Sequence, residues 1–322
     1  MSTIKFFFAG KYYSFYRISL GIISIAVLFL FFISCDINND DDTKPPCINC
    51  PVDFRLTDFE PAWSPDGKTI AYVHGDTVES KTGLFLIDTS GLNKILLLSS
   101  ASASSPSWSF DGKWLVFSMS AQIYKIKANG DSLTQLTNQG SNFFPSFSPD
   151  GNWIAYDSNV DSPNGMNFIW KMKSDGTHKI RIAYDPTKGE IRMPSWSKDG
   201  NNIAHTRYVG IGAPEVFVMD KNGNNIIRLT NNTKDDRFPK YAFENNIVYW
   251  SDANLWIMDS SGSNHKQITI EGVETGFGTP FDFSQDQKKV VYTRYQPNCW
   301  SYDNGDLFIL DLITGRKKTI NL

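Results

Sequence analysis

Short apolar segments bounded by turn residues follow one another along most of the chain, and no stretch between them keeps a helical period. Segments such as 69–73 (TIAYV), 84–88 (LFLID) and 114–118 (WLVFS) are rich in β-branched and aromatic residues, which favour strands. Gly, Asp, Asn and Pro lie between these segments and favour tight turns. The pattern predicts an all-β protein made of many short strands.

The strands recur in a fixed order, and one phrase marks each copy. It reads PAWSPDGKTIAY at 61–72, returns with small changes from 106, 145 and 194, and returns in weaker form from 239 and 281. The copies lie 45, 39, 49, 45 and 42 residues apart, measured at the aromatic residue of the phrase: Trp63, Trp108, Phe147, Trp196, Tyr241 and Phe283. We interpret these aromatic residues as core packing residues rather than a ligand-stacking ladder, because large apolar side chains fill the space between neighbouring sheets.

Each copy predicts four strands, and four strands every 40 residues or so are the sequence form of a propeller blade. The six copies therefore predict a six-bladed β-propeller of four-stranded antiparallel blades over residues 53–322. The segments 53–59 and 316–322 both look like a fourth strand. The sequence leaves open which end of the chain completes the last blade.

The core of the repeated phrase, WSPDGKTIAY in the first copy, resembles the TolB-like family of propeller repeats, which are WD40-like. The likeness is strong in the first four copies and weaker in the last two. The resemblance implies the propeller fold. It implies little about function, because such blades serve scaffolds, binding modules and enzymes.

The start of the chain has the parts of an export signal. Residues 1–17 carry three basic residues and no acid, an uncharged apolar run follows at 18–33, and Cys35 comes just after it. This ending resembles the lipobox of bacterial lipoproteins, whose Cys becomes the lipidated first residue, although Phe32 stands where that family usually has Leu. The resemblance implies a signal peptide over 1–34 and a lipid anchor at Cys35. An uncleaved anchor with an incidental Cys is the alternative.

Residues 35–52 are predicted to be a tether that is rich in Asp and contains Pro45-Pro46. The acidic residues close to the lipidated Cys resemble the surface-export signals of Bacteroidetes-type lipoproteins, although a solvated linker has the same composition. We therefore expect an exported outer-membrane lipoprotein, with exposure on the cell surface as a hypothesis.

Lipidation of Cys35 would leave three cysteines, which are Cys47, Cys50 and Cys299. Cys47 and Cys50 have Cys-x-x-Cys spacing, but a zinc site needs a second pair of ligands, and the sequence offers none. In an oxidising compartment either one is a candidate disulfide partner of Cys299. Such a bond would tie the tether to the last blade.

Strand direction separates two faces of the predicted propeller. The turns after first and third strands share one face and are short and uniform, whereas the loops after second strands and the links between blades share the other and vary widely. We expect the variable face to bind a ligand, because loops on a rigid scaffold usually carry function. The candidate ligand-binding residues are His74, Phe143, Arg192, Arg207, Tyr208, Arg237, Tyr295, Trp300 and Tyr302.

Two of these candidates, Arg192 and Arg237, occupy the same place in consecutive blades, two residues before the proline of the repeated phrase. Two guanidinium groups at a channel mouth suit a carboxylate or a phosphate. The competing interpretation is that they form ordinary ion pairs with the acids beside them in the sequence.

Catalytic motifs of hydrolases, zinc proteases and phosphate-binding loops are missing from the sequence, and its four histidines are scattered. We predict no metal and no cofactor. The 31 basic and 34 acidic residues form no basic stripe, which argues against nucleic acid as a partner.

These observations favour a monomeric, non-enzymatic module that binds or scaffolds an envelope protein or a glycan. The alternative is a propeller-type enzyme with its site at the channel mouth, such as a polysaccharide lyase, a glycosidase or a relative of peptidases. Such sites draw single residues from several blades and leave no local motif.

Overall fold

The computed structural model describes the strands 4–8 and 11–15 and the residues 57–76, 79–185, 189–209, 212–252, 254–269, 280–294 and 306–320. The chain divides into two units, Met1–Asn49 and Cys50–Leu322. In the first unit, β1 (Ile4–Phe8) pairs antiparallel with β2 (Lys11–Phe15). The predicted apolar run, Cys35 and the tether lie outside the described residues. Within the described part of the chain, no helix is long and apolar enough to span a membrane.

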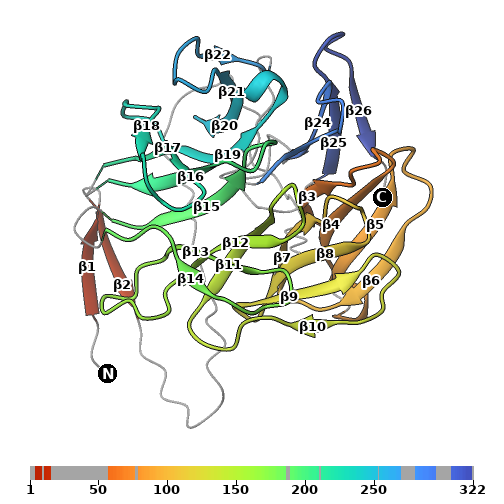
Figure 1. The fold of residues 1–322 in the computed structure, drawn as a ribbon, viewed down its shortest axis with the longest axis horizontal. Coiled ribbons are helices and arrows are strands. Elements are labelled where there is room, and N and C mark those ends of the chain that lie inside the picture. The colour runs from red at the N-terminus through yellow and green to blue at the C-terminus, as the bar shows by residue number, and fades with distance from the viewer. Residues whose placement is uncertain are drawn as a thin grey trace. The chain divides into compact units, whose positions relative to one another are not determined.

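The second unit consists of six four-stranded antiparallel sheets that surround a common axis as the blades of a propeller (Figure 1). Blades one to three contain β3 (Thr57–Trp63), β4 (Thr69–Gly75), β5 (Gly83–Asp88) and β6 (Ile95–Ser99); β7 (Ala103–Trp108), β8 (Trp114–Met119), β9 (Gln122–Lys127) and β10 (Thr134–Gln135); and β11 (Asn142–Phe147), β12 (Trp153–Ser158), β13 (Phe168–Lys173) and β14 (Ile180–Arg181).

Blades four to six contain β15 (Ile191–Trp196), β16 (Asn202–Tyr208), β17 (Pro214–Asp220) and β18 (Ile227–Arg228); β19 (Asp236–Tyr241), β20 (Ile247–Ser251), β21 (Asn254–Met258) and β22 (Lys266–Gln267); and β23 (Asp282–Phe283), β24 (Lys289–Arg294), β25 (Asp306–Asp311) and β26 (Lys317–Ile320). Among the described residues, two single-turn helices, η1 (Glu79–Lys81) and η2 (Phe243–Asn245), lie between strands. Each sheet follows chain order from the axis outward, so the predicted six-bladed, all-β fold is confirmed.

The fourth strands of blades two to five pair over two residues each, which is shorter than the predicted segments. In blades two, four and five, a threonine hydroxyl continues the pairing beyond the short ladder. Thr137 Oγ1 accepts the N–H of Ile123 at 2.8 Å, and Thr230 Oγ1 accepts that of Val216 at 2.9 Å. The threonine that follows these three strands therefore completes the outer edge of the blade.

The repeated Ser-x-Asp-Gly turn closes the hairpin between first and second strands. In blade one, Asp66 accepts hydrogen bonds from the Ser64 hydroxyl at 2.6 Å and the Lys68 N–H at 3.0 Å, and these bonds lower the pKa of Asp66. Gly67 supplies the φ of +72° that the turn requires. The same Ser–Asp bond recurs at Asp111, Asp150, Asp199 and Asp286.

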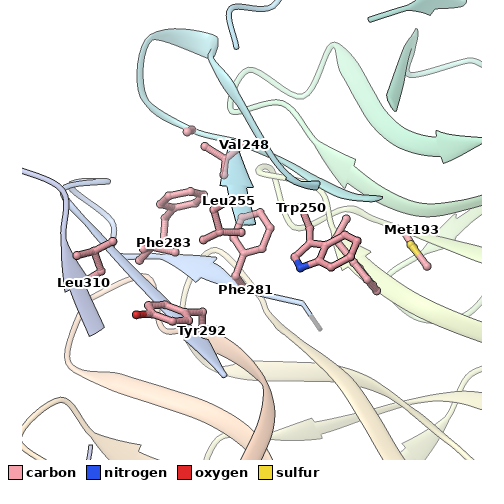
Figure 2. Close-up of a cluster of buried hydrophobic side chains, with 11 residues drawn as sticks. Met193, Val248, Trp250, Leu255, Phe281, Phe283, Tyr292 and Leu310 are labelled. Carbon is pink, nitrogen blue, oxygen red and sulfur yellow. The ribbon is translucent and has the colours of Figure 1, made fainter. Parts of the chain in front are cut away.

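The aromatic residues of the repeated phrase pack between blades, as interpreted from the sequence. The indole Nε1 of Trp108 donates to the carbonyl of Ala62 in the preceding blade at 3.0 Å. Figure 2 shows one inter-blade cluster, in which Trp250 of blade five packs with Phe283 and Tyr292 of blade six. Burial of these large side chains between sheets is the main force that holds the blades together.

The C-terminal end of the chain completes the last blade, because β26 pairs antiparallel with β25. The expectation that 53–59 looks like a fourth strand is wrong for its described part, since 57–59 belong to β3, the innermost strand of blade one. Blade six meets blade one through side chains instead of a shared sheet. Trp63, Tyr72 and Phe85 of blade one share a buried cluster with Leu307 and Ile320 of blade six.

Candidate functional site

The innermost strands of blades one to five bend halfway along, directly before a proline. The pairing register shifts there, and the residue before the proline has a φ between +49° and +59°; these residues are Glu60, Ser105, Phe144, Met193 and Phe238. Such a conformation costs a non-glycine residue about 1–3 kcal/mol and persists only where its surroundings hold it. We call these five residues the waist, because they line the axis between the mouth on the variable face and the mouth on the turn face.

The waist is mostly apolar and narrow. The rings of Phe144 and Phe238 belong to blades three and five, yet their centroids lie 5.7 Å apart. Side chains from non-adjacent blades therefore meet across the axis. They separate the residues that line one mouth from the residues that line the other.

At the variable-face mouth, Arg192 is fixed by carboxylates and by aromatic rings. Its Nε donates to Asp157 Oδ2 at 2.6 Å, and its Nη1 lies 3.9 Å from Glu190 Oε2. The guanidinium carbon lies 5.9 Å from the ring centroid of Phe143 and 5.6 Å from that of Phe144. Burial raises the pKa of Asp157 to about 6, against the opposing effect of Arg192.

Arg237 is held in a similar way one blade further on. Its Nε and Nη2 donate to the two carboxylate oxygens of Asp235, both at 2.5 Å. Its guanidinium carbon lies 5.6 Å from the ring centroid of Tyr208. Burial raises the pKa of Tyr208, and the charges of Arg237 and Arg192 oppose that shift. The charges of both arginines thus act to lower the pKa of the same tyrosine, which places all three residues at one mouth.

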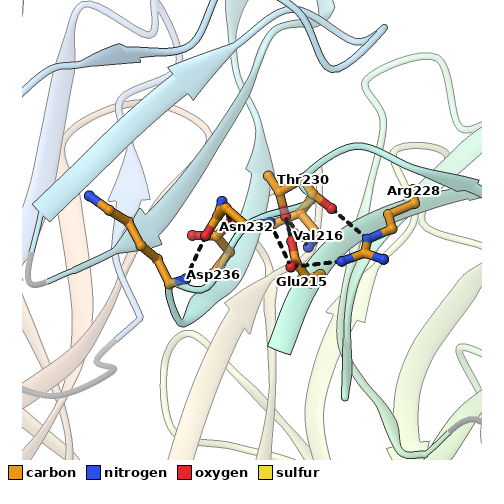
Figure 3. Close-up of polar contacts among 7 residues, drawn as sticks. Glu215, Val216, Arg228, Thr230, Asn232 and Asp236 are labelled. Atoms are coloured by element: carbon orange, nitrogen blue, oxygen red, sulfur yellow. Dashed lines mark hydrogen bonds and ion pairs between the residues drawn. The ribbon is translucent and has the colours of Figure 1, made fainter. Parts of the chain in front are cut away.

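A hydrogen-bond network around the buried Glu215 fixes the link that leads to Arg237 (Figure 3). Glu215 is 1% exposed and accepts hydrogen bonds from Arg228 Nη2 at 2.8 Å and from the Thr230 hydroxyl at 2.6 Å. It also accepts the N–H of Asn232, whose side-chain amide donates to Asp236 at 2.8 Å. The link between blades four and five therefore enters β19 in a defined conformation, directly before Arg237.

The structure brings four of the sequence candidates together at this mouth: Phe143, Arg192, Tyr208 and Arg237. Both arginines also form the neighbouring ion pairs that the competing interpretation expected. Tyr295, Trp300 and Tyr302 lie outside the described residues, as do Cys47, Cys50 and Cys299.

The other two candidates are buried in blades. Arg207 is 5% exposed and donates to Asp185 at 2.8 Å, with its guanidinium carbon 5.7 Å from the ring centroid of Phe217. His74 is 7% exposed, and its Nδ1 lies 2.7 Å from Asp58 Oδ1. These contacts hold both side chains within their blades.

Sequence reasoning missed a cavity of about 340 Å³ that runs from the waist to the turn face. Its wall includes a proline from each of five innermost strands, Pro61, Pro106, Pro145, Pro194 and Pro239. Glu60 lies at its inner end, where Glu60 Oε2 accepts the N–H of Ser105 at 2.5 Å and burial raises the pKa of Glu60 to about 7. A sequence signal existed, because Glu60 is the one charged residue that directly precedes the proline of the repeated phrase.

These features define the class of protein as a six-bladed β-propeller with two mouths of different chemistry. Residues 53–209 match the model of the TolB beta propeller domain, so this part of the propeller is TolB-like. A curated relative, an uncharacterized protein of Agrobacterium fabrum, is 28% identical over 167 residues. The match covers 48% of this chain and 56% of the relative, so the chain spans about half the length of that protein.

Solved structures share the fold. A TolB candidate from Agrobacterium tumefaciens has a TM-score of 0.61 at 20% identity, over 71% of this chain and 84% of that one. An oligogalacturonate lyase from Vibrio parahaemolyticus has a TM-score of 0.56 at 8% identity, over 83% of this chain and 79% of that one. Identities this low show the fold alone, and this fold hosts both binding proteins and enzymes.

Proposed function

We propose that this protein is a non-enzymatic binding module of the bacterial envelope that holds a protein or a glycan at its variable-face mouth. The observation that carries the proposal is the matched pair of arginines, Arg192 and Arg237. Each is held on an aromatic ring, and their side chains remain 21% and 30% exposed. Arginine and tyrosine dominate binding energy at protein interfaces, and side chains fixed in advance lose little entropy on binding.

The ligand would carry an acidic group. Arg237 already binds a carboxylate in bidentate geometry, and that carboxylate, on Asp235, is 37% exposed. A ligand carboxylate can take the same positions if Asp235 turns toward solvent. An acidic peptide segment or a uronic-acid glycan has this chemistry.

The predicted signal peptide over 1–34 and the lipid anchor at Cys35 support an outer-membrane setting for this module, and the TolB-like propeller is consistent with it. The Asp-rich tether supports exposure on the cell surface. One chain supplies all six blades, which fits a monomer.

A propeller-type enzyme is the competing function. The acids at this mouth favour recognition over catalysis, because Asp157 and Asp235 are both engaged in ion pairs with the arginines. A catalytic carboxylate would need to face the substrate.

The first prediction concerns Arg237→Ala. After recovery of the partner by cross-linking and affinity purification, its affinity should fall about 10- to 100-fold, because the variant removes one fixed guanidinium group. Arg181→Ala is the matched control: this guanidinium carbon lies 4.0 Å from the ring centroid of Tyr184, on the outer strand of blade three. Equal losses in both variants, or in neither, would exclude the variable-face mouth as the binding site.

A further inference from the structure

The cavity on the turn face has the properties of a small-ligand site, and it lies on the opposite face from the proposed partner site. Its volume of about 340 Å³ falls within the usual range for ligand pockets. It opens among the uniform turns, where Phe110 is 66% exposed beside Pro65 and Pro149. An exposed aromatic ring at the rim of a cavity is a ready contact for an apolar ligand.

Prolines form much of the apolar wall of the cavity. Proline has no N–H group, so the prolines of the five innermost strands offer no hydrogen-bond donor to a ligand. Trp63, Trp108 and Trp196 add aromatic surface nearer the turns. At the waist, the side chains of Phe144, Met193 and Phe238 form the apolar part of the floor.

One carboxyl group interrupts this apolar floor. Among the described residues, no basic side chain pairs with Glu60, and Ser105 is its hydrogen-bonding partner. The other charged groups that line the cavity are Lys198, Lys240 and Asp282. Lys240 pairs with Asp282 at 2.9 Å, and Lys198 lies in the turn of blade four, across the axis from blade one. The end of the cavity next to Glu60 is therefore acidic.

We infer that the turn-face cavity binds an organic cation, namely a protonated amine or guanidinium group attached to an apolar body, with Glu60 as its counter-ion. The apolar body lies against the prolines and tryptophans, and the cationic head reaches the waist. A carboxylate with no cation of its own attracts such a head strongly when water is excluded. A neutral ligand of the same shape would leave that carboxylate without a counter-ion.

Glu60 also has a structural role, which decides the choice of variant. On β16, His205 stands where blade one has Tyr72, and the hydroxyl of the next residue, Thr206, accepts the waist N–H of Phe238 at 3.2 Å. Blade one has Val73 at that position, so Glu60 itself accepts the waist N–H of Ser105. Glu60→Gln keeps an acceptor for this N–H and removes the negative charge alone.

The test is calorimetric titration of the purified full chain with 2-phenylethylammonium at pH 8.5 and pH 5.5, and with neutral 2-phenylethanol. We expect the ammonium to bind at pH 8.5. Affinity should fall about tenfold or more in each of three comparisons, because each removes one charge of the pair. At pH 5.5 and in Glu60→Gln the carboxylate charge is lost, and with the neutral alcohol the ammonium charge is lost. Glu244→Gln, an exposed acid in η2 that does not line the cavity, is the control and should bind as the native chain does.

Three outcomes would overturn the inference: no binding of the ammonium, equal binding of the alcohol, or unchanged affinity in Glu60→Gln. The comparison of ammonium with alcohol in the native chain does not depend on how the variant folds. Loss of partner binding in Arg237→Ala tests the other mouth, so the two results are independent.

Discussion

At the scale of single residues, burial sets the charge of the acids near the axis. Asp157 is fully buried beside Arg192, whereas Glu60 at the waist pairs with no basic side chain of the described residues. Burial raises the pKa of both carboxyl groups. The turn acids behave in the opposite way, because hydrogen bonds from Ser64 and Lys68 lower the pKa of Asp66. The propeller thus keeps its turn acids charged and holds its axial acids closer to neutrality.

The second prediction uses this difference at Asp157. Its pKa is about 6 in the folded chain, above the ordinary value of 3.8, so folding favours its protonated form. The resulting stability is present in acid and is lost as the pH rises through 6. Between pH 7.5 and pH 5 this carboxyl group should add about 1 kcal/mol to the free energy of unfolding.

Asp157→Asn lacks this titration and should lack that gain, which urea denaturation at the two pH values measures. Glu60 titrates in the same direction in both proteins, so its contribution cancels in the comparison. An identical pH slope in the variant would mean that Asp157 stays charged throughout.

At the scale of elements, the turns between third and fourth strands fix one blade on the next. A Cβ at Gly223, in the turn of blade four, would lie 1.5 Å from the carbonyl oxygen of Ile182 in blade three. The same feature recurs at Gly262, where a Cβ would lie 2.9 Å from the carbonyl oxygen of Leu229. By contrast, a Cβ at Gly67 would meet no atom within 4 Å.

The third prediction compares Gly67→Ala with Gly223→Ala. Both residues have a positive φ, so each substitution carries a backbone cost of about 1 kcal/mol. Gly223→Ala must also push two blades apart and should cost more than about 3 kcal/mol. Equal free energies of unfolding for the two variants, measured in urea, would contradict this inter-blade contact.

The sequence predicted the blades well because each strand repeats its own signals. The third strands fall where segments such as 84–88 predicted them, within β5, and the Ser-x-Asp-Gly turns fall where Asp and Gly stand together. The fourth strands were harder to predict, because the Thr230 hydroxyl replaces a strand pairing and hides the boundary. The waist cavity could not be predicted, since it depends on how five strands bend around one axis.

At the scale of the whole molecule, side-chain packing closes the ring. The Trp63 N–H donates to Asp282 Oδ2 at 2.8 Å, and Lys318 Nζ donates to the Thr89 carbonyl at 3.0 Å. Both bonds link the two ends of the propeller, as does the buried cluster around Ile320. Stability of the ring therefore depends on the last strand of the chain.

The fourth prediction tests that closure with Ile320→Ala. Ile320 is 1% exposed within the cluster that joins blade six to blade one, and its loss should lower the free energy of unfolding by about 2–4 kcal/mol. Ile313→Ala is the control, because this side chain is 70% exposed in the same blade and should change stability little. A neutral Ile320→Ala would show that other contacts carry the closure.

The central claim is that a partner binds at the variable-face mouth, and photo-cross-linking in intact cells tests it most directly. A photoreactive phenylalanine analogue would replace Phe143 beside Arg192, or Leu133, which is 44% exposed beside the outer strand of blade two. We predict one dominant adduct from position 143, none of the same mass shift from position 133, and loss of the adduct when Arg237→Ala is added. The same adduct from both positions, or none from position 143, would contradict the account.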